Sequence, residues 1–323
     1  MTDLTTALAP GRPDGPLTED RADALVDLVV TPHTDAAPAP VDAAQGRPAR
    51  LRYAVRHLVR RPGLVVAVLW LVAVLVAAVA PSVLASGDPL AGVPAEKLTG
   101  PSAQHWFGTD QLGRDLYTRV VHGTGTTLHA ALLAIAIGLV VGSVLGLLAG
   151  FVGGAVDAVL MRVADVLLAI PGLLLSLAVV TALGFGTTNV AIAVGATSVA
   201  SVSRILRSEV LRVRTSAYVE AARAGGSRWW RVLLVHVLPN SVGPVLVLAA
   251  LELGTAILAV SSLSFLGYGA QPPQPEWGSL VAGGRDYLGG QWWLTTLPGI
   301  VIALTVLAGN RLARALDTEG TPS

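Results

Sequence analysis

Few side chains in this 323-residue chain are arranged to do covalent or metal chemistry. There is no cysteine, and the six histidines form no pair four residues apart and no cluster with carboxylates, which a helical metal site would need. No serine, histidine and aspartate share a recognised spacing. The single lysine, Lys97, follows Pro94-Ala95-Glu96 and not a glycine-rich turn, so a phosphate-binding loop is missing. We expect no catalytic residue, no metal site and no cofactor bound by this chain.

The polar residues that do follow a pattern lie in residues 204–240, between two apolar runs. The stretch holds seven arginines and, in order, Glu220-Ala221-Ala222, Gly226 and Leu238-Pro239. Residues 216–224 predict a helix capped by Ser216, because alanine and glutamate favour helix. Gly225 and Gly226 predict a tight turn. A second helix, capped by Ser227, is expected to end at Pro239. The stretch therefore predicts a helix-turn-helix presented at a membrane face.

The order of these residues resembles the EAA loop of permease subunits from binding-protein-dependent ABC importers. Two further runs are similar to the oligopeptide and dipeptide branch of that family: Phe107-Gly108-Thr109-Asp110-Gln111-Leu112-Gly113-Arg114-Asp115, and Ser262-Leu263-Ser264-Phe265-Leu266-Gly267. His236 stands where the general pattern usually has isoleucine, but residues 236–240 are themselves similar to that branch. The resemblance covers the chain from about Leu64 to its C-terminus.

The resemblance implies a type I ABC importer permease fold with six transmembrane helices and both termini in the cytoplasm. In that family the EAA loop inserts into a groove on a cytoplasmic ATPase. The coupling residues implied here are Glu220, Ala221, Ala222, Gly226, Leu238 and Pro239. The implied partners are a homologous second permease, one or two ABC ATPase subunits that hold ATP and magnesium, and an extracytoplasmic solute-binding protein. The implied function is import of dipeptides, oligopeptides or related solutes by a subunit that is not an enzyme.

Composition places the chain in a membrane independently of the resemblance. Hydrophobic residues make up 53% of the chain and charged residues 13%, whereas soluble domains carry about 25% charged residues. Together with a mean hydropathy of +0.64, this predicts a membrane protein. The resemblance implies an all-α, multi-pass protein of the cytoplasmic (inner) membrane, with membrane lipid and no nucleic acid as partners. The N-terminus lacks the pattern of a cleavable signal peptide.

Six apolar runs are candidates for helices that cross the bilayer core, which takes about 20 residues. Their expected ranges are 62–81, 127–151, 156–183, 189–205, 242–266 and 295–310. The second carries Gly138, Gly142, Gly146 and Gly150, one glycine every four residues, which predicts a face for close helix packing. The third is expected to kink at Pro171, because proline removes a backbone hydrogen bond.

The basic residues decide the orientation. With both termini in the cytoplasm, sixteen basic residues lie near the inner ends of the spans. Those outside are Lys97, Arg114, Arg119 and Arg285. The positive-inside rule then places residues 204–240 in the cytoplasm without use of the resemblance.

Four regions follow from this arrangement. Residues 1–48 are expected to be a disordered cytoplasmic tail, with a docking peptide that folds on a partner as the alternative. Residues 49–126 hold the first span and a long extracytoplasmic loop. Residues 127–314 form the core permease domain with the coupling loop at 207–240, and residues 315–323 form a cytoplasmic tail.

The extracytoplasmic loop is expected to contain an amphipathic helix along the outer membrane surface, with an ion pair between Asp115 and Arg119. Trp277 is expected at the outer membrane interface. The candidate functional residues of this loop are Gly108, Asp110, Gly113, Arg114 and Asp115.

Two acids inside apolar spans are candidates for the translocation path. A charge at a helix centre costs about 2.5–3.5 kcal/mol and is seldom kept without use. Glu252 lies deepest, and a path-lining carboxylate and a buried, hydrogen-bonded structural one are weighed equally. For Asp165, an ion pair with Arg162 three residues earlier is the main alternative to a path role.

The sequence leaves the solute open between peptides, nickel chelates, glutathione and other small molecules. A secondary transporter driven by an ion gradient is the alternative class. Such a transporter would show paired intramembrane charges and inverted repeats, and the sequence shows neither.

Overall fold

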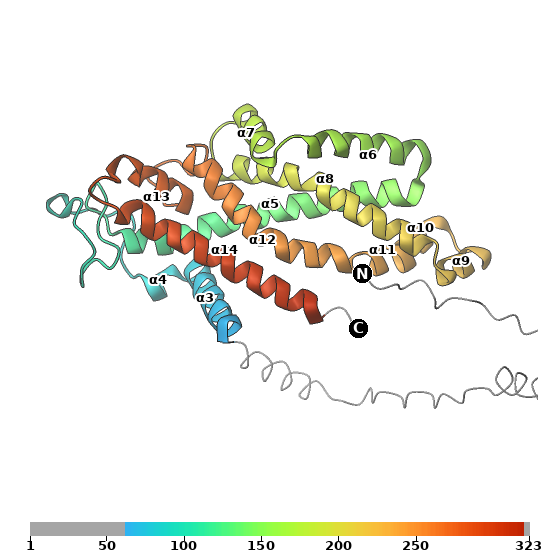
Figure 1. The fold of residues 1–323 in the computed structure, drawn as a ribbon, viewed down its shortest axis with the longest axis horizontal. Helices are drawn as coiled ribbons and strands as arrows, with labels where there is room; N and C mark the ends of the chain where they lie inside the picture. The colour runs from blue at the N-terminus through green and yellow to red at the C-terminus, as the bar shows by residue number, and fades with distance from the viewer. Residues whose placement is uncertain (1–61, 320–323) are drawn as a thin grey trace, which may run out of the picture. The chain divides into compact units, whose positions relative to one another are not determined.

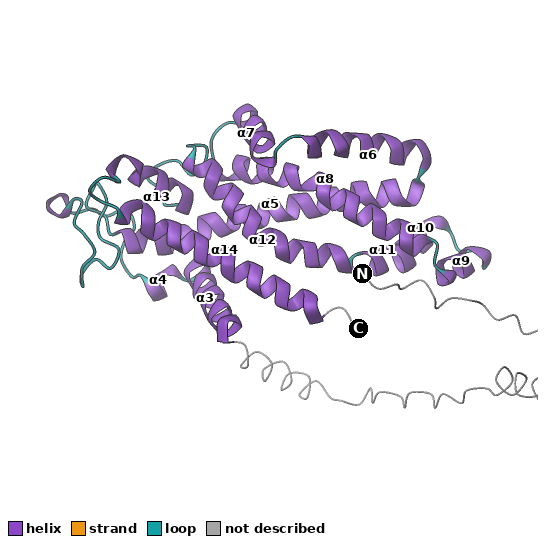
Figure 2. Cartoon of the chain, viewed as in Figure 1, coloured by secondary structure: helices purple, strands orange, loops and turns teal. Residues whose placement is uncertain are grey.

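The computed structural model describes residues 62–319, and this part of the chain is almost entirely helical (Figures 1 and 2). Five of its helices are long and apolar enough to cross a membrane. They are α3 (Pro62–Val79), α5 (Leu116–Val152), α8 (Thr187–Arg214), α12 (Gly243–Phe265) and α14 (Trp293–Glu319). The all-α membrane architecture predicted from the sequence is confirmed. The basic residues before α3 and the tail 1–48 lie outside the described residues.

The third predicted span is the bent one. It forms α6 (Gly154–Ala169) and α7 (Gly172–Leu183), which meet at 99°, so the count of spans is six if this pair is one broken span. Pro171 lies at the N-cap of α7, and the helix stops before it. The expected kink is therefore a complete break, because the residue before a proline disfavours helical geometry.

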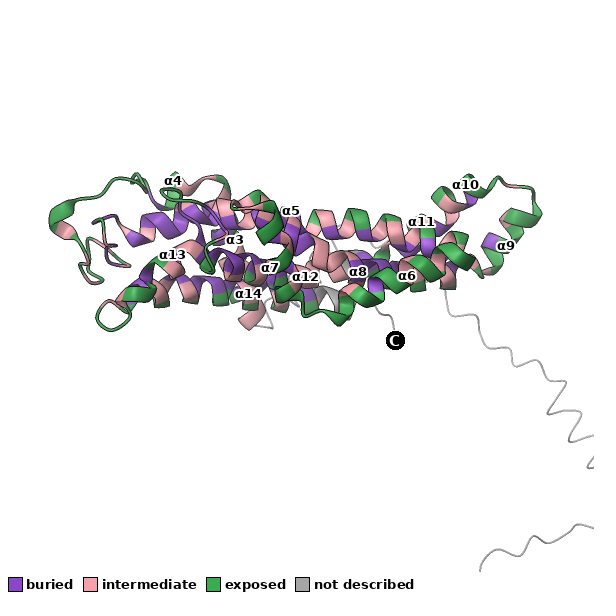
Figure 3. Cartoon of the chain, turned by 90° about the horizontal axis from the view of Figure 1, so that it is seen from above, coloured by how far each residue is buried: buried purple, intermediate pink, exposed green. Residues whose placement is uncertain are grey.

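Shorter helices connect the spans. They are α4 (Pro81–Leu84), η1 (Pro94–Glu96), α9 (Ala217–Ala224), α10 (Trp229–Arg231), the π-helix η2 (Val232–Val237), α11 (Leu238–Ser241), α13 (Trp277–Gly284) and η3 (Arg285–Tyr287). Among them, α9 and α10 lie at one end of the helices and α13 lies at the other (Figures 1 and 3).

The glycine face of α5 is a packing face, as predicted. α5 lies alongside α8 (Figure 1). A Cβ atom on Gly142 would lie 2.7 Å from the Cβ of Val202, and one on Gly146 would lie 2.5 Å from the carbonyl oxygen of Ser203. Only glycine leaves room for backbones this close, so α5 and α8 form the tightly packed centre of the fold.

The prediction of a separate amphipathic helix along the outer membrane surface is wrong. Its residues from Leu116 onward are the first turns of α5, whose 37 residues make about 55 Å of helix, against a hydrocarbon core of about 30 Å. The expected Asp115–Arg119 pair is absent too. Asp115 caps α5 by accepting a hydrogen bond from the Thr118 N–H, and the Arg119 guanidinium faces Asp110. The cap begins the helix here, so the chain continues straight into the span.

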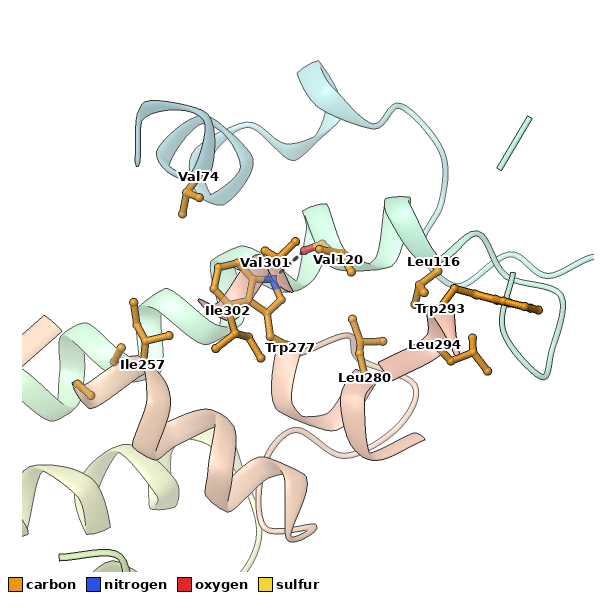
Figure 4. Packing of buried hydrophobic residues seen from close by; sticks show 12 residues of the cluster. Val74, Leu116, Val120, Ile257, Trp277, Leu280, Trp293, Leu294, Val301 and Ile302 are labelled. Atoms are coloured by element: carbon orange, nitrogen blue, oxygen red, sulfur yellow. Dashed lines mark hydrogen bonds between the residues drawn. The ribbon is translucent and has the colours of Figure 1, made fainter. Parts of the chain in front are cut away.

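The ring of Trp277, which the sequence placed at the outer membrane interface, packs inside the protein and not at its surface. It is fully buried, and its indole Nε1–H donates to the carbonyl oxygen of Val120 at 3.0 Å (Figure 4). The apolar cluster around it joins α3, α5, α12, α13 and α14. A tryptophan can be buried at low cost when its N–H finds an acceptor.

Candidate functional site

The loop between α8 and α12 has the predicted helix-turn-helix form. α8 ends at Arg214, α9 follows directly, and a turn leads into α10 and η2. Most of α9 and α10 is exposed, in contrast to the buried residues between the long helices (Figure 3).

One face of α9 holds it to the body of the protein. Val219 is fully buried and Ala222 is half-buried, and both join an apolar cluster with the inner end of α8 and with η2. Glu220 and Ala221 are exposed on the other side of the same helix. The helical period therefore separates an anchoring face from a face with small and charged side chains that is free to contact another subunit.

The turn after α9 requires glycine at position 226. Gly226 has φ of +77°, and its N–H donates to the carbonyl of Arg223, while the Ser227 N–H donates to that of Ala222. This pair of hydrogen bonds is the Schellman ending of a helix. Nothing lies within 4 Å of a Cβ built on Gly226, so the requirement is conformational and not steric.

Two expected helix caps are not formed. Ser216 holds the N-cap position of α9, but its hydroxyl donates backward to the carbonyl of Val213 and caps no N–H group. Arg228, and not Ser227, is the N-cap residue of α10. Serine hydroxyls bond equally well to nearby carbonyls, and sequence alone does not choose between the two.

The sequence predicted that the second helix ends at Pro239, and this is wrong, because the helix continues through it. The helix widens into the π-helix η2, where the Leu238 N–H donates to Leu233, five residues back, and α11 then runs on to Ser241. Pro239 has no N–H to give to the preceding turn. The Asn240 side chain donates to the carbonyl of His236 at 2.7 Å. The widened turn accommodates the proline without stopping the helix.

The loop is also tied to the inner end of α5. Arg214 Nη1 donates to the carbonyl oxygen of Gly150 at 2.7 Å. The Arg223 guanidinium lies 5.8 Å from the ring centroid of Phe151, whose ring is 6.4 Å from that of Trp229. A cation at a helix C-terminus and over an aromatic face is favourable in both places. These contacts join the loop to α5, which packs against α8 along its glycine face.

The comparison with known protein families agrees with this loop and shows the family. Residues 142–319 match the binding-protein-dependent transport system inner membrane component family. The chain belongs to this family. It is a multi-pass permease of the inner membrane and a non-catalytic subunit of an ABC importer. Membership implies ATPase and solute-binding-protein partners, with ATP bound by the ATPase.

Individual relatives agree with this assignment. The permease is 41% identical over 227 residues to a probable D,D-dipeptide transport system permease of Escherichia coli (strain K12), covering 70% of this chain and 76% of that protein. It is 46% identical over 217 residues to a glutathione transport system permease of Shigella flexneri serotype 5b (strain 8401), covering 67% and 72%. The solved MetNI methionine ABC transporter is similar with a TM-score of 0.47 at 20% identity, over 61% of this chain and 95% of that one.

Asp165 pairs with a different partner from the one expected. Its carboxylate is bonded by Arg204 of α8, and not by Arg162 of its own helix. A second carboxylate of α6, Asp157, receives two hydrogen bonds from Arg207, from Nε at 2.5 Å and from Nη2 at 2.6 Å. Both pairs connect α6 to α8, a contact between separate helices that local spacing could not reveal.

Glu252 lies on α12 and faces α8. It is half-buried, and its Oε2 accepts a hydrogen bond from the Ser198 hydroxyl at 2.7 Å.

The candidate residues of the outer loop form a compact polar cluster. Gly108 and Gly113 have φ of +74° and +75° and set two sharp turns. Asp110, between them, accepts hydrogen bonds from the backbone N–H groups of Leu112 and Arg114 and from Arg114 Nε. Asp115 contacts His105 at 2.9 Å as well as capping α5. All five predicted residues thus lie in one small turn region ahead of α5.

Sequence reasoning missed Glu276, which organises the other half of the outer side. It is fully buried and caps α13 by accepting hydrogen bonds from the N–H groups of Gly278 and Ser279, and it also accepts one from the Thr127 hydroxyl. Burial raises the pKa of Glu276, and the two N–H groups oppose that rise. The available signal was an acid directly before an apolar run, a common helix start.

Proposed function

We propose that this permease forms, together with a homologous second permease, the translocation path of an ATP-driven importer for dipeptides or for small peptides such as glutathione. One or two ABC ATPase subunits supply the energy, and an extracytoplasmic solute-binding protein delivers the solute. The relatives support this substrate class, since one is a probable D,D-dipeptide transport permease and the other a glutathione transport permease. Both termini are proposed to lie in the cytoplasm, on the side of the basic loop.

The single observation that supports coupling through the loop is the division of α9 into two faces. Val219 anchors it, while Glu220 and Ala221 are exposed. We propose that the exposed face, the Gly226 turn and the Leu238-Pro239 segment contact the ATPase. Closure of the ATPase would then move α5 and α8 together, because the loop is bonded to both.

The test uses Glu220→Lys and Gly226→Asp in the assembled importer. Each is expected to abolish solute-stimulated ATPase activity, while membrane insertion and assembly of the two permeases persist. Glu220→Lys reverses a charge on the contact face, and Gly226→Asp introduces about 1–2 kcal/mol of backbone strain into the turn.

The matched control is Gly184→Asp. Gly184 has φ of +90° and ψ of −173°, which only glycine adopts readily, and nothing lies within 4 Å of a Cβ. The same substitution therefore introduces at least as much backbone strain at the end of α7, away from the loop. Intact stimulation in the two loop variants, or equal loss in the control, contradicts the coupling proposal.

Glu252 and Asp165 are proposed as residues of the translocation path. For Glu252, one support is its position in the middle of an apolar span. The other is that its carboxylate accepts one hydrogen bond from the side chains of the described residues, so lone pairs remain for a solute ammonium group. Uptake into proteoliposomes by Glu252→Gln and Asp165→Asn is expected to fall at least severalfold. Unchanged uptake with unchanged expression removes the residue from the path.

A further inference from the structure

The extracytoplasmic side contains a cavity that no coupling or path role accounts for. Its volume is about 450 Å³, and it lies among the start of α5, the connection from α12 to α13, and α13 itself. Volumes of about 300–1,000 Å³ are usual for small-molecule sites. Apolar walls come from Leu116, Leu280 and Leu294 (Figure 4), and amide groups come from Gln111, Gln271 and Gln274.

The charges lining this cavity do not balance. Arg114 and Arg119 both line it, with side chains only 10% and 7% exposed, and the only acid among the lining residues is Asp110. The nearby Glu96, His105 and Asp115 contact one another and do not line the cavity. Two guanidinium groups thus share one carboxylate, which leaves one buried positive charge. A buried charge without a counter-ion is costly.

Asp110 has little capacity left for the second arginine. One of its oxygens accepts two backbone N–H groups and the other accepts Arg114 Nε at 2.7 Å. Arg119 Nε stays 3.6 Å away and makes no hydrogen bond within the described residues, although Arg119 Nη1 donates to the Pro89 carbonyl at 3.1 Å. A buried donor on a cationic side chain is therefore left for an anion in the cavity.

We propose that this cavity binds the free carboxylate of a small peptide solute, with Arg119 as its main cationic contact. The proposal rests on the proposed function, because it names the part of the solute that this permease recognises. A guanidinium fits a carboxylate better than any other side chain does. The amide and apolar walls suit the remainder of a short peptide, and the volume exceeds what one acidic side chain of a docked protein needs.

The experiment measures binding of alanyl-alanine and of its C-terminal amide to the assembled importer in nanodiscs, without the solute-binding protein. The acid is expected to bind on the order of tenfold more tightly than the amide, since a hydrogen bond to a charged group contributes about 1.5–3 kcal/mol. Arg119→Gln should lose this preference, and Arg119→Lys should retain part of it.

A second variant guards against misfolding of Arg119→Gln. Gly283 lines the cavity, and a Cβ built there meets nothing within 4 Å, so Gly283→Leu adds a bulky side chain to the cavity wall at a position where its Cβ has room. Leucine also favours the helix α13 over glycine. Binding of alanyl-alanine should fall at least tenfold in Gly283→Leu, with an unchanged unfolding midpoint, and Gly283→Ala should bind as the wild type does.

Equal binding of acid and amide by the wild type, or absence of binding, overturns the proposal. So does a result in which Arg119→Gln weakens only docking of the solute-binding protein, which would assign the cavity to an acidic side chain of that protein. ATP-dependent uptake by the wild-type importer is measured in parallel. If uptake persists while the binding results fail, this inference is wrong and the proposed function stands; if uptake itself is missing, the proposed function fails.

Discussion

The polar residues at the two ends of the described part of this permease differ in burial and in hydrogen bonding. On the outer side, Glu276 and Asp110 are buried and receive several hydrogen bonds from their own chain. In helix α9 of the coupling loop, Glu220 and Ala221 are exposed, and Val219 is the one buried residue of that helix. Polar groups that contact another subunit must keep hydrogen-bonding capacity for it. Polar groups that hold a rigid structure instead form their hydrogen bonds within their own chain. This contrast is what the proposed roles require: a rigid outer side, and a loop with an exposed face for another subunit.

The largest effect expected from this contrast is on folding of the outer side. Trp277→Ala should lower the free energy of unfolding by about 3–5 kcal/mol, because it empties a fully buried site and removes the indole hydrogen bond to the Val120 carbonyl. Thermal unfolding in detergent measures the change. Trp292→Ala, at a side chain 52% exposed, is the control and should change stability by less than about 0.5 kcal/mol. Similar losses in both variants would remove the contrast.

A smaller effect is expected in the pH dependence of stability. Because burial raises the pKa of Glu276, the folded state holds this proton more tightly than the unfolded state does. The resulting stabilisation is fully present below the ordinary glutamate pKa of about 4.3 and is lost as pH rises through the raised pKa.

Unfolding midpoints between pH 4 and pH 8 check this sign. The decline with rising pH should flatten in Glu276→Gln and persist in Asp286→Asn, whose side chain is 78% exposed. A decline of the same slope in Glu276→Gln would show that another group causes it.

The smallest effect on stability is expected in the coupling loop. Tyr218, 46% exposed on α9, should tolerate Tyr218→Ala within about 0.5 kcal/mol, while Val219→Ala at the buried neighbouring position should cost roughly 2 kcal/mol. Solute-stimulated ATPase activity should nevertheless fall in Tyr218→Ala, since its side chain belongs to the exposed face. Equal stability losses at the two positions would mean that α9 has no free face.

The coupling loop was the most predictable part of the molecule because its structure is local. The helix over residues 216–224 and the Gly226 turn depend on near neighbours, and both are present. The errors there concern which acceptor a serine hydroxyl chooses and how a helix passes a proline. In both cases the alternative conformations differ in free energy by about 1 kcal/mol, and contacts with neighbouring turns decide between them. Residue types alone do not resolve so small a difference.

The outer side was predicted less well because its contacts are distant in sequence. Trp277 donates to Val120, and Thr127 donates to Glu276, across about 150 residues of chain. The pairing of Asp165 with Arg204 also joins separate helices, where the sequence offered only the local Arg162. Spacing rules for helices reach three or four residues and cannot anticipate such partners.

The sequence by itself determined the membrane class, the approximate ranges of the spans, the glycine packing face, and the helix and glycine turn of residues 216–226, because apolar length, glycine spacing and helix propensity act through local or averaged physics. Only the tertiary structure decided that α5 continues outward to Leu116, that Glu276 and Trp277 are buried together, and that two arginines share one carboxylate at a cavity. Those features depend on contacts between helices that are far apart in the chain. Whether a residue is buried depends on these contacts and not on its residue type alone.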